Sequence, residues 1–442
     1  MQLYLFIICL VVFLFAMKKL SGCYVEQYIL LSLFIVMELV PFLYIILIDY
    51  DITNNIYSRS IMQLTLFGNF LLFSIVLIYA KPSKEYLPIN NSQSKSEPAF
   101  LLESDIFQES KKFPSGIITL ILISWLIFSL YLLISSITFS LSDSRTDAWA
   151  EIVQDEASYG AGFWGVIQML FNGLFWVALH DALTSKDIKL RNLGIRSLQI
   201  ITLLSVAITL KSGMYRSPAI FNILFGLIIY HLYVAQIDLK KYLSIGIICV
   251  PFYMSFAAYV REGDVDKSNA NYLHGLSGVA TAFDYEFLIY LLQHDEIQYE
   301  NGLQYTYNLI SFVPRFIWPD KPSTSFSWRM SEKIYGTIGK KAWVHTYTPW
   351  GEGYAQFGVI GTVINTIILC IIYSYLKKFV FNNPRYIINV VSIFLVGLPI
   401  LLRGDLSVFF GAIYRLLFIS IFVNFVHLFF NRLDKVNDTL TT

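Results

Sequence analysis

The chain has 442 residues, of which 56% are hydrophobic and only 14% charged, against about 25% charged residues in soluble domains. Apolar runs of about 20 residues recur along it, and each is long enough to cross a hydrocarbon core of roughly 30 Å. These counts exclude an ordinary soluble enzyme and indicate a multi-spanning membrane protein. The net charge of +1 excludes a global attraction for nucleic acid, and three of the four cysteines lie inside apolar runs, which argues against a disulfide framework or a zinc site.

Eleven apolar segments are predicted as transmembrane helices. In chain order they lie at 3–17, 26–48, 61–80, 115–138, 161–180, 197–213, 217–235, 242–260, 354–375, 386–402 and 406–429. The first run has its lysines after it rather than before it, so it is expected to be a retained span with the N-terminus outside. The C-terminus is then cytoplasmic, and Lys and Arg are more numerous in the predicted cytoplasmic segments than in the short outside ones.

The predicted domains follow from these spans. Residues 1–260 form an N-terminal transmembrane bundle with a polar cytoplasmic linker at 81–114, residues 261–353 form one large extracytoplasmic loop, and residues 354–442 form a C-terminal bundle. The expected fold class is therefore all-α and polytopic.

The large loop separates its charges, with acids in its first part and bases in its second. Arginine forks bind phosphate oxygens in pairs, and aromatic rings stack on the apolar faces of sugars. The residues of this kind that would bind a phosphorylated sugar are Arg315, Lys321, Arg329, Trp318 and Trp328. A solvated surface without a specific ligand is the alternative. Within the loop, 281–293 is predicted as a helix that either lies in the membrane interface or packs inside the loop.

Two motifs stand in the second half of the loop and at the following span. The first is Phe312-Val-Pro-Arg-Phe-Ile-Trp-Pro-Asp-Lys-Pro322. The second is His345-Thr-Tyr-Thr-Pro-Trp-Gly-Glu-Gly-Tyr-Ala-Gln-Phe-Gly-Val-Ile-Gly361. Together they resemble the O-antigen polymerases, also called oligosaccharide repeat-unit polymerases, whose members have about ten to fourteen spans and one large outside loop. At the level of motifs the resemblance covers about 310–361.

The resemblance implies a glycosyltransferase with a helical GT-C-like fold in the bacterial inner membrane. Such enzymes join undecaprenyl-pyrophosphate-linked repeat units on the outer face of that membrane, moving the growing chain onto the next unit, and the product is O-antigen or capsular polysaccharide. Membrane lipid, a chain-length regulator and a flippase of the same pathway are the implied partners; no nucleic acid and no cofactor are expected. An O-antigen ligase and a polysaccharide flippase or transporter are the alternatives, and the first motif favours the polymerase.

The reaction needs cations for the pyrophosphate leaving group. Arg216 is the first candidate because the apolar run before it, 197–210, is only about 21 Å long at 1.5 Å per residue. Its turn should therefore be recessed and face a water-filled cavity, where a charge is retained for binding. The other candidates are Arg261, Arg315 and Arg403. Arg261 could equally be an interface anchor, and Arg403 could form a salt bridge with Asp405.

The acceptor hydroxyl needs a base, for which the candidates are Glu352 and His345. Glu352 belongs to the second motif and lies where the loop re-enters the membrane, and an imidazole titrates in the useful range. Asp-x-Asp pairs at 49–51 and 264–266 could hold a metal ion, but acids are common at helix ends and no metal is predicted.

Glu38 and Arg415 are the clear charges inside predicted spans, and each lies ten residues from the outer end of its helix. Both are therefore expected roughly 15 Å deep. Because an isolated charge in lipid is costly, they are predicted to form a structural ion pair between the second and last spans.

Overall fold

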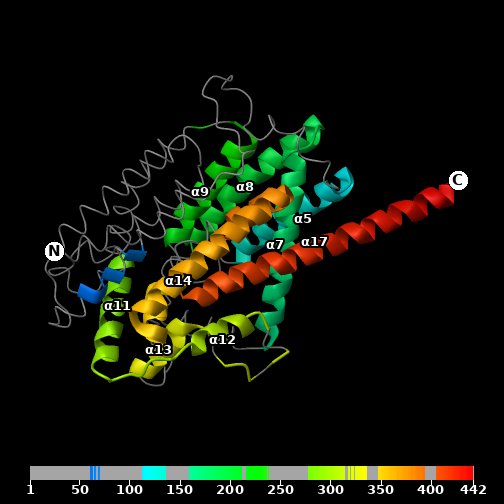
Figure 1. The fold of residues 1–442 in the computed structure, drawn as a ribbon. Helices are drawn as coiled ribbons and strands as arrows, with labels where there is room; N and C mark the ends of the chain where they lie inside the picture. Colours follow the sequence, from blue (N-terminus) through cyan, green and yellow to red (C-terminus); the bar gives the residue numbers. More distant parts are fainter. Residues whose placement is uncertain are drawn as a thin grey trace.

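A computed structural model of the chain describes residues 60–62, 64–65, 68–69, 112–135, 159–211, 216–235, 237, 277–313, 317–318, 320–322, 324–335, 347–393 and 405–441. Among these residues the regular structure is helical throughout and contains no strand (Figure 1). The all-helical class predicted from the apolar runs is confirmed for this part of the chain.

Four helices and the C-terminal helix form a bundle around a central member. They are α5 (Ser115–Ser135), α7 (Tyr159–Leu183), α8 (Ile188–Lys211), α9 (Arg216–Tyr233) and α17 (Leu406–Thr441). α7 is central because α5, α8 and α17 all pack against it (Figure 1), and nearly every side chain from Leu174 to Leu183 is buried. Glycines allow the close approach: a Cβ at Gly173 would overlap Ile419 of α17.

Three described helices are long and apolar enough to cross a membrane. The segments that meet this criterion are Val166–Leu183 in α7, Thr348–Val380 in α14 (Thr348–Asn382) and Phe409–Phe430 in α17. Each overlaps a predicted span, at 161–180, 354–375 and 406–429 respectively, so the protein has helices suited to a membrane.

The other predicted spans have different outcomes. The described residues of 115–138 and 197–213 belong to α5 and α8, and 217–235 is helical as far as Tyr233 in α9. The segment 386–402 begins as the 3-10 helix η6 (Pro384–Tyr386) followed by α15 (Ile387–Val391). The predicted spans outside the described residues are 3–17, 26–48 and 242–260, together with most of 61–80 and of 386–402.

α17 shows the pattern expected of a helix that faces lipid. Its buried side chains recur every three or four residues and form one stripe, Phe409, Ala412, Leu416, Ile419 and Val423. Most of the remaining described surface is also apolar but uncovered, with Leu417, Ile421 and Phe425 exposed beside the polar Arg415 and Asn424. An uncovered apolar surface of this extent is typical of a membrane contact.

α14 is not one straight helix. Phe357 (φ −144°, ψ 30°) and Gly358 (φ 59°, ψ −143°) leave helical geometry, and a left-handed φ such as that of Gly358 favours glycine. The break divides α14 into a re-entrant arm, residues 348–356, and a spanning arm, residues 359–382. The spanning arm alone is about 36 Å long at 1.5 Å per residue, which is sufficient to cross the hydrocarbon core.

The two arms of α14 fold back against each other. Gly353 and Gly361 touch backbone to backbone, and a Cβ on either would overlap the carbonyl group of the other. Along a straight helix the same residues would be about 12 Å apart. The Trp350 indole N–H also donates a hydrogen bond to the Thr366 hydroxyl at 3.0 Å. α14 is therefore a helical hairpin (Figure 1), which the single span predicted at 354–375 does not describe.

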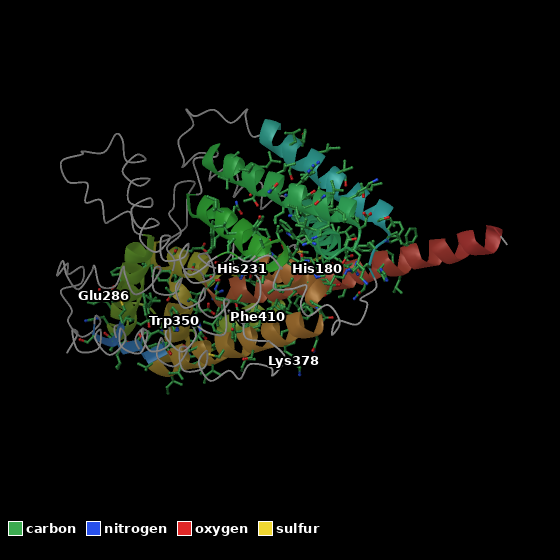
Figure 2. All side chains as sticks on the ribbon, turned by 90° about the horizontal axis from the view of Figure 1, so that it is seen from above. His180, His231, Glu286, Trp350, Lys378 and Phe410 are labelled. Atoms are coloured by element: carbon green, nitrogen blue, oxygen red, sulfur yellow. The ribbon has the colours of Figure 1, made fainter. Side chains whose placement is uncertain are left out.

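Segments that the predicted topology assigns to one side of the membrane lie together. At one end of the bundle, Asp181 of α7 accepts hydrogen bonds from Arg385 Nε at 3.1 Å and Nη2 at 2.5 Å, and from the Phe113 backbone N–H at 3.2 Å. This buried ion pair joins three segments predicted to be cytoplasmic. Figure 2 shows Trp350 of the hairpin apart from His180, the residue before Asp181 in α7.

Candidate functional site

The loop helices dock at the end of the molecule where α14 turns back and α17 begins (Figure 1). They are α11 (Ser277–Gln293), α12 (Leu303–Ile310) and α13 (Phe326–Tyr335). α11 contains the predicted helix 281–293 and packs against α14, with Leu288, Ile289 and Leu292 buried. Of the two interpretations of this helix, the structure favours packing inside the loop.

Glu352 lies in the re-entrant arm and is completely buried. Its Oε1 accepts a hydrogen bond from Asn308 Nδ2 of α12 at 3.1 Å. Its Oε2 accepts one from the backbone N–H of Leu406, the first residue of α17, at 2.6 Å. The unpaired N–H groups of a first helical turn favour a carboxylate at this position. The Glu352 side chain therefore joins the hairpin, α12 and the start of α17.

Asp405, the residue before α17, is a second buried carboxyl group and interacts electrostatically with Glu352. Its Oδ2 accepts hydrogen bonds from the Ser327 N–H at 2.9 Å and the Ser325 hydroxyl at 3.0 Å, and its Oδ1 accepts one from the Ser407 hydroxyl. Asp405 thus ties the start of α13 to the start of α17. Two buried carboxyl groups close together in one network are an arrangement found at catalytic sites.

Glu300 is the third acid of this network, which comprises Glu300, Asn308, Glu352, Gln356 and Asp405. Its carboxylate accepts hydrogen bonds from Arg329 Nη2 at 2.9 and 3.0 Å and from Gln356 Nε2 at 2.8 Å. The Arg329 guanidinium also lies 4.4 Å from the centre of the Tyr307 ring. In this structure Arg329 is bound to the Glu300 carboxylate. To bind a pyrophosphate as predicted, its Nη2 would have to leave Glu300.

Tyr305 borders the network beside the turn of the hairpin. Its hydroxyl donates a hydrogen bond to Asn365 Oδ1 at 2.7 Å, and its ring stacks on Phe357 with centroids 6.1 Å apart. Burial, and secondarily the nearby Glu352 carboxyl group, raise the pKa of Tyr305 well above its usual value. The phenol therefore remains a neutral hydrogen-bond donor at physiological pH.

The described residues of the first motif lie beside α12. Lys321 Nζ donates hydrogen bonds to the carbonyl oxygens of Val313 at 2.7 Å and Ser311 at 3.1 Å, which closes the turn. Trp318 is exposed, whereas Trp328 is half-buried in α13. An exposed indole is available for stacking, so the predicted contact of Trp318 with sugar stays a prediction that this geometry permits.

The remaining candidates are only partly described. The residues Glu38, Arg261, Arg315, His345 and Arg403 lie outside the described part of the chain. Arg216 begins α9, but its side chain is outside that part. α8 starts at Ile188, nine residues before the apolar run, so its full length is about 36 Å and does not by itself force a recessed turn. Arg415 is exposed on α17, and its predicted pair with Glu38 stays a prediction.

The sequence pattern gives little sign of several members of the network. Asn308 belongs to no charge cluster or motif, and Glu300 is only one of several acids in the first part of the loop. Gln356 lies inside the second motif but is not among the predicted site residues, and Asp405 is suggested only as a partner of Arg403. One signal is present: Gln304 and Asn308 are four residues apart, so they share a helix face.

No family model, no curated protein and no solved structure matches this chain. The resemblance to O-antigen polymerases therefore rests on the motifs at 312–322 and 345–361, and the candidate site rests on the geometry around Glu352.

Proposed function

We propose that the protein is a glycosyltransferase that polymerises undecaprenyl-pyrophosphate-linked repeat units into O-antigen or capsular polysaccharide on the outer face of the bacterial inner membrane. The observation that supports this most is the complete burial of Glu352, the acid of the second motif, in a polar network at the end of an apolar helical bundle. The proposal includes a GT-C-like fold with eleven spans, an outside N-terminus and a cytoplasmic C-terminus.

In the proposed reaction the bond between the anomeric carbon of the growing chain and its pyrophosphate oxygen breaks. A hydroxyl of the next repeat unit forms the new glycosidic bond and gives its proton to a base, and undecaprenyl pyrophosphate leaves with the electron pair. Glu352 is proposed as this base, with His345 as the rival. Arg216 and Arg315 are the cations proposed to bind the pyrophosphate, aided by Arg261 and Arg403.

The burial of Glu352 adds a requirement to this mechanism. Both carboxyl oxygens are hydrogen-bonded and neither is exposed to solvent, so an acceptor hydroxyl reaches them only after a neighbour moves. Asn308 is carried by α12, a helix of only eight residues. Displacement of this short helix would expose Oε1, as loops that gate other active sites do.

The test is the polysaccharide ladder of a strain deleted for this gene. Wild type and the variants Arg216→Ala, Arg315→Ala and Glu352→Gln are supplied at matched membrane levels, with Glu296→Gln as the control because Glu296 is exposed in the turn after α11. We expect long chains from wild type and from Glu296→Gln, and single repeat units from the deletion and the other variants.

Two other results would contradict the proposal. Absence of even a single capped unit in the deletion strain would indicate a flippase, a transporter or a ligase. Long chains from Glu352→Gln would remove Glu352 as the base and leave His345 to be tested. Size-exclusion profiles of each purified variant separate loss of activity from loss of folding.

A further inference from the structure

α12 has its polar and apolar faces reversed relative to a helix at a water-exposed surface. At 100° per residue, Gln304 and Asn308 share one face, while Leu303 and Leu309 lie on the opposite half of the helix. The two polar side chains are fully buried, whereas Leu303 is 45% and Leu309 is 59% exposed. A helix on a soluble surface would turn its leucines inward, so the surroundings of α12 are not water alone.

Hydrogen bonds fix the orientation of α12. Asn308 donates to Glu352 at 3.1 Å, and Gln304 Nε2 donates to the Thr324 carbonyl oxygen at 2.8 Å and to Asn308 Oδ1 at 2.7 Å. Rotation of the helix about its axis would break the bonds to Glu352 and Thr324 and leave buried polar groups without partners, which is costly. The outward position of the leucines is therefore imposed by the buried network.

The apolar surface continues along the chain after α12. The exposed apolar side chains of this part are Phe312, Ile317 and Trp318, and Ile317 is 64% exposed; Asp320, the next described residue, is exposed as well. The segment is anchored to α17, because the Phe312 ring packs on Tyr414 with centroids 5.2 Å apart and the Tyr414 hydroxyl donates a hydrogen bond to the Leu309 carbonyl oxygen at 3.3 Å.

The two helices that pack against α12 also carry exposed apolar side chains. α12 packs against both α14 and α17, and Phe357 and Ile360 are exposed at the turn of the hairpin. Further along these helices the exposed apolar side chains include Ile367, Ile371, Ile421 and Phe425. Those faces belong to helices suited to cross a membrane, so lipid is the contact that α12 and the spans would share.

We propose that α12 and the described residues that follow it, 303–313 with 317 and 318, lie within the bilayer at the boundary of headgroups and acyl chains, and that lipid acyl chains cover their apolar face. Exposed Trp318 fits this depth, because tryptophan is enriched at membrane interfaces. The polar face of α12 then forms the wall between lipid and the carboxylate of Glu352. This placement does not depend on the proposed glycosyltransferase activity.

The test measures collisions of nitroxide labels with oxygen, which concentrates in lipid, and with a water-soluble nickel chelate. Labels are placed in the full-length protein, with its natural cysteines replaced by alanine, after Leu309→Cys or Ile317→Cys substitution. Ile421→Cys on α17 is the lipid reference, and Glu296→Cys is the water-exposed control. The protein is reconstituted into vesicles of phosphatidylethanolamine and phosphatidylglycerol.

We expect labels at positions 309 and 317 to collide more with oxygen than with the nickel chelate, as at 421, and the label at 296 to show the reverse. Greater collision with nickel at 309 and 317 would place α12 in water. Low collision with both reagents would mean that protein covers this face, and either result overturns the proposal.

A second measurement uses a conservative substitution that leaves α12 itself unchanged. In vesicles of lipids brominated on the acyl chain near the headgroup, the tryptophan emission quenched by bromine should be smaller for Trp318→Phe than for wild type. Equal quenching of the two proteins would show that Trp318 does not reach the acyl chains.

Discussion

The hairpin of α14 makes a sharp prediction for Gly361→Ala. The new Cβ would overlap the Gly353 carbonyl group, with backbone rather than a flexible side chain in the way. Forced overpacking costs about 1–3 kcal/mol, whereas alanine in an unobstructed helix stabilises by about 0.5–1 kcal/mol relative to glycine. Gly411→Ala in α17 is the matched control, because a Cβ there meets nothing within 4 Å. We expect a lower unfolding temperature in detergent for Gly361→Ala and an equal or higher one for Gly411→Ala.

Equal unfolding temperatures for the two variants would refute the backbone contact between the arms. A direct measure of the fold uses Pro349→Cys with Asn365→Cys in a background without other cysteines, since Asn365 Nδ2 donates to the Pro349 carbonyl oxygen at 2.5 Å. A straight helix would separate these positions by about 24 Å. A short bifunctional thiol reagent should therefore join them in the hairpin, and absence of the intramolecular product would indicate a continuous helix.

Three further changes test the contacts at the two ends of the bundle. Asp405→Ala removes the acceptor of three hydrogen bonds and should lower the free energy of unfolding by about 2–3 kcal/mol. Ser407→Ala removes only one of these bonds and should lower it by about 1 kcal/mol. Equal losses for the two variants would contradict the role of Asp405 as acceptor of all three bonds. Arg385→Ala removes the arginine partner of the buried Asp181 and should cost about 3–5 kcal/mol. This would be seen as loss of monodisperse protein in size-exclusion chromatography, while the exposed control Arg196→Ala should behave as wild type. Tyr305→Phe should cost about 1 kcal/mol through its lost hydrogen bond, and an unchanged unfolding midpoint would count against that bond.

The sequence predicts where a helix begins when the apolar run alone defines the helix. The starts of α5 and α17 coincide with the predicted 115 and 406. The start of α8 differs because Lys189, Arg191 and Arg196 give its first turns the composition of a loop, although their backbone hydrogen bonds are helical. Periodicity of apolar residues does not detect a helix turn whose charged side chains lie outside the core.

The candidate site is less predictable because it depends on contacts between distant residues. Glu352 is marked by its motif, but its partners Asn308 and Leu406 lie 44 and 54 residues away. The polar face of α12 is buried, although apolar residues usually lie inside a protein. The sequence pattern of this helix would therefore predict that its leucines are buried, whereas its polar side chains are. The hairpin depends on a left-handed Gly358 and on contact between two glycines, neither of which composition reveals.

The bond between Glu352 and the Leu406 amide has a consequence for the biogenesis of the protein. Ribosomal synthesis delivers the re-entrant arm first, then the residues of the spanning arm against which it folds, and the amide of residue 406 only afterwards. Until that last helix has been made, the carboxyl group of Glu352 is held in the hairpin without one of its two donors. A chain whose synthesis stalls before residue 405 would therefore expose this acid to the insertion and quality-control machinery, and completion of the site would coincide with completion of the bundle.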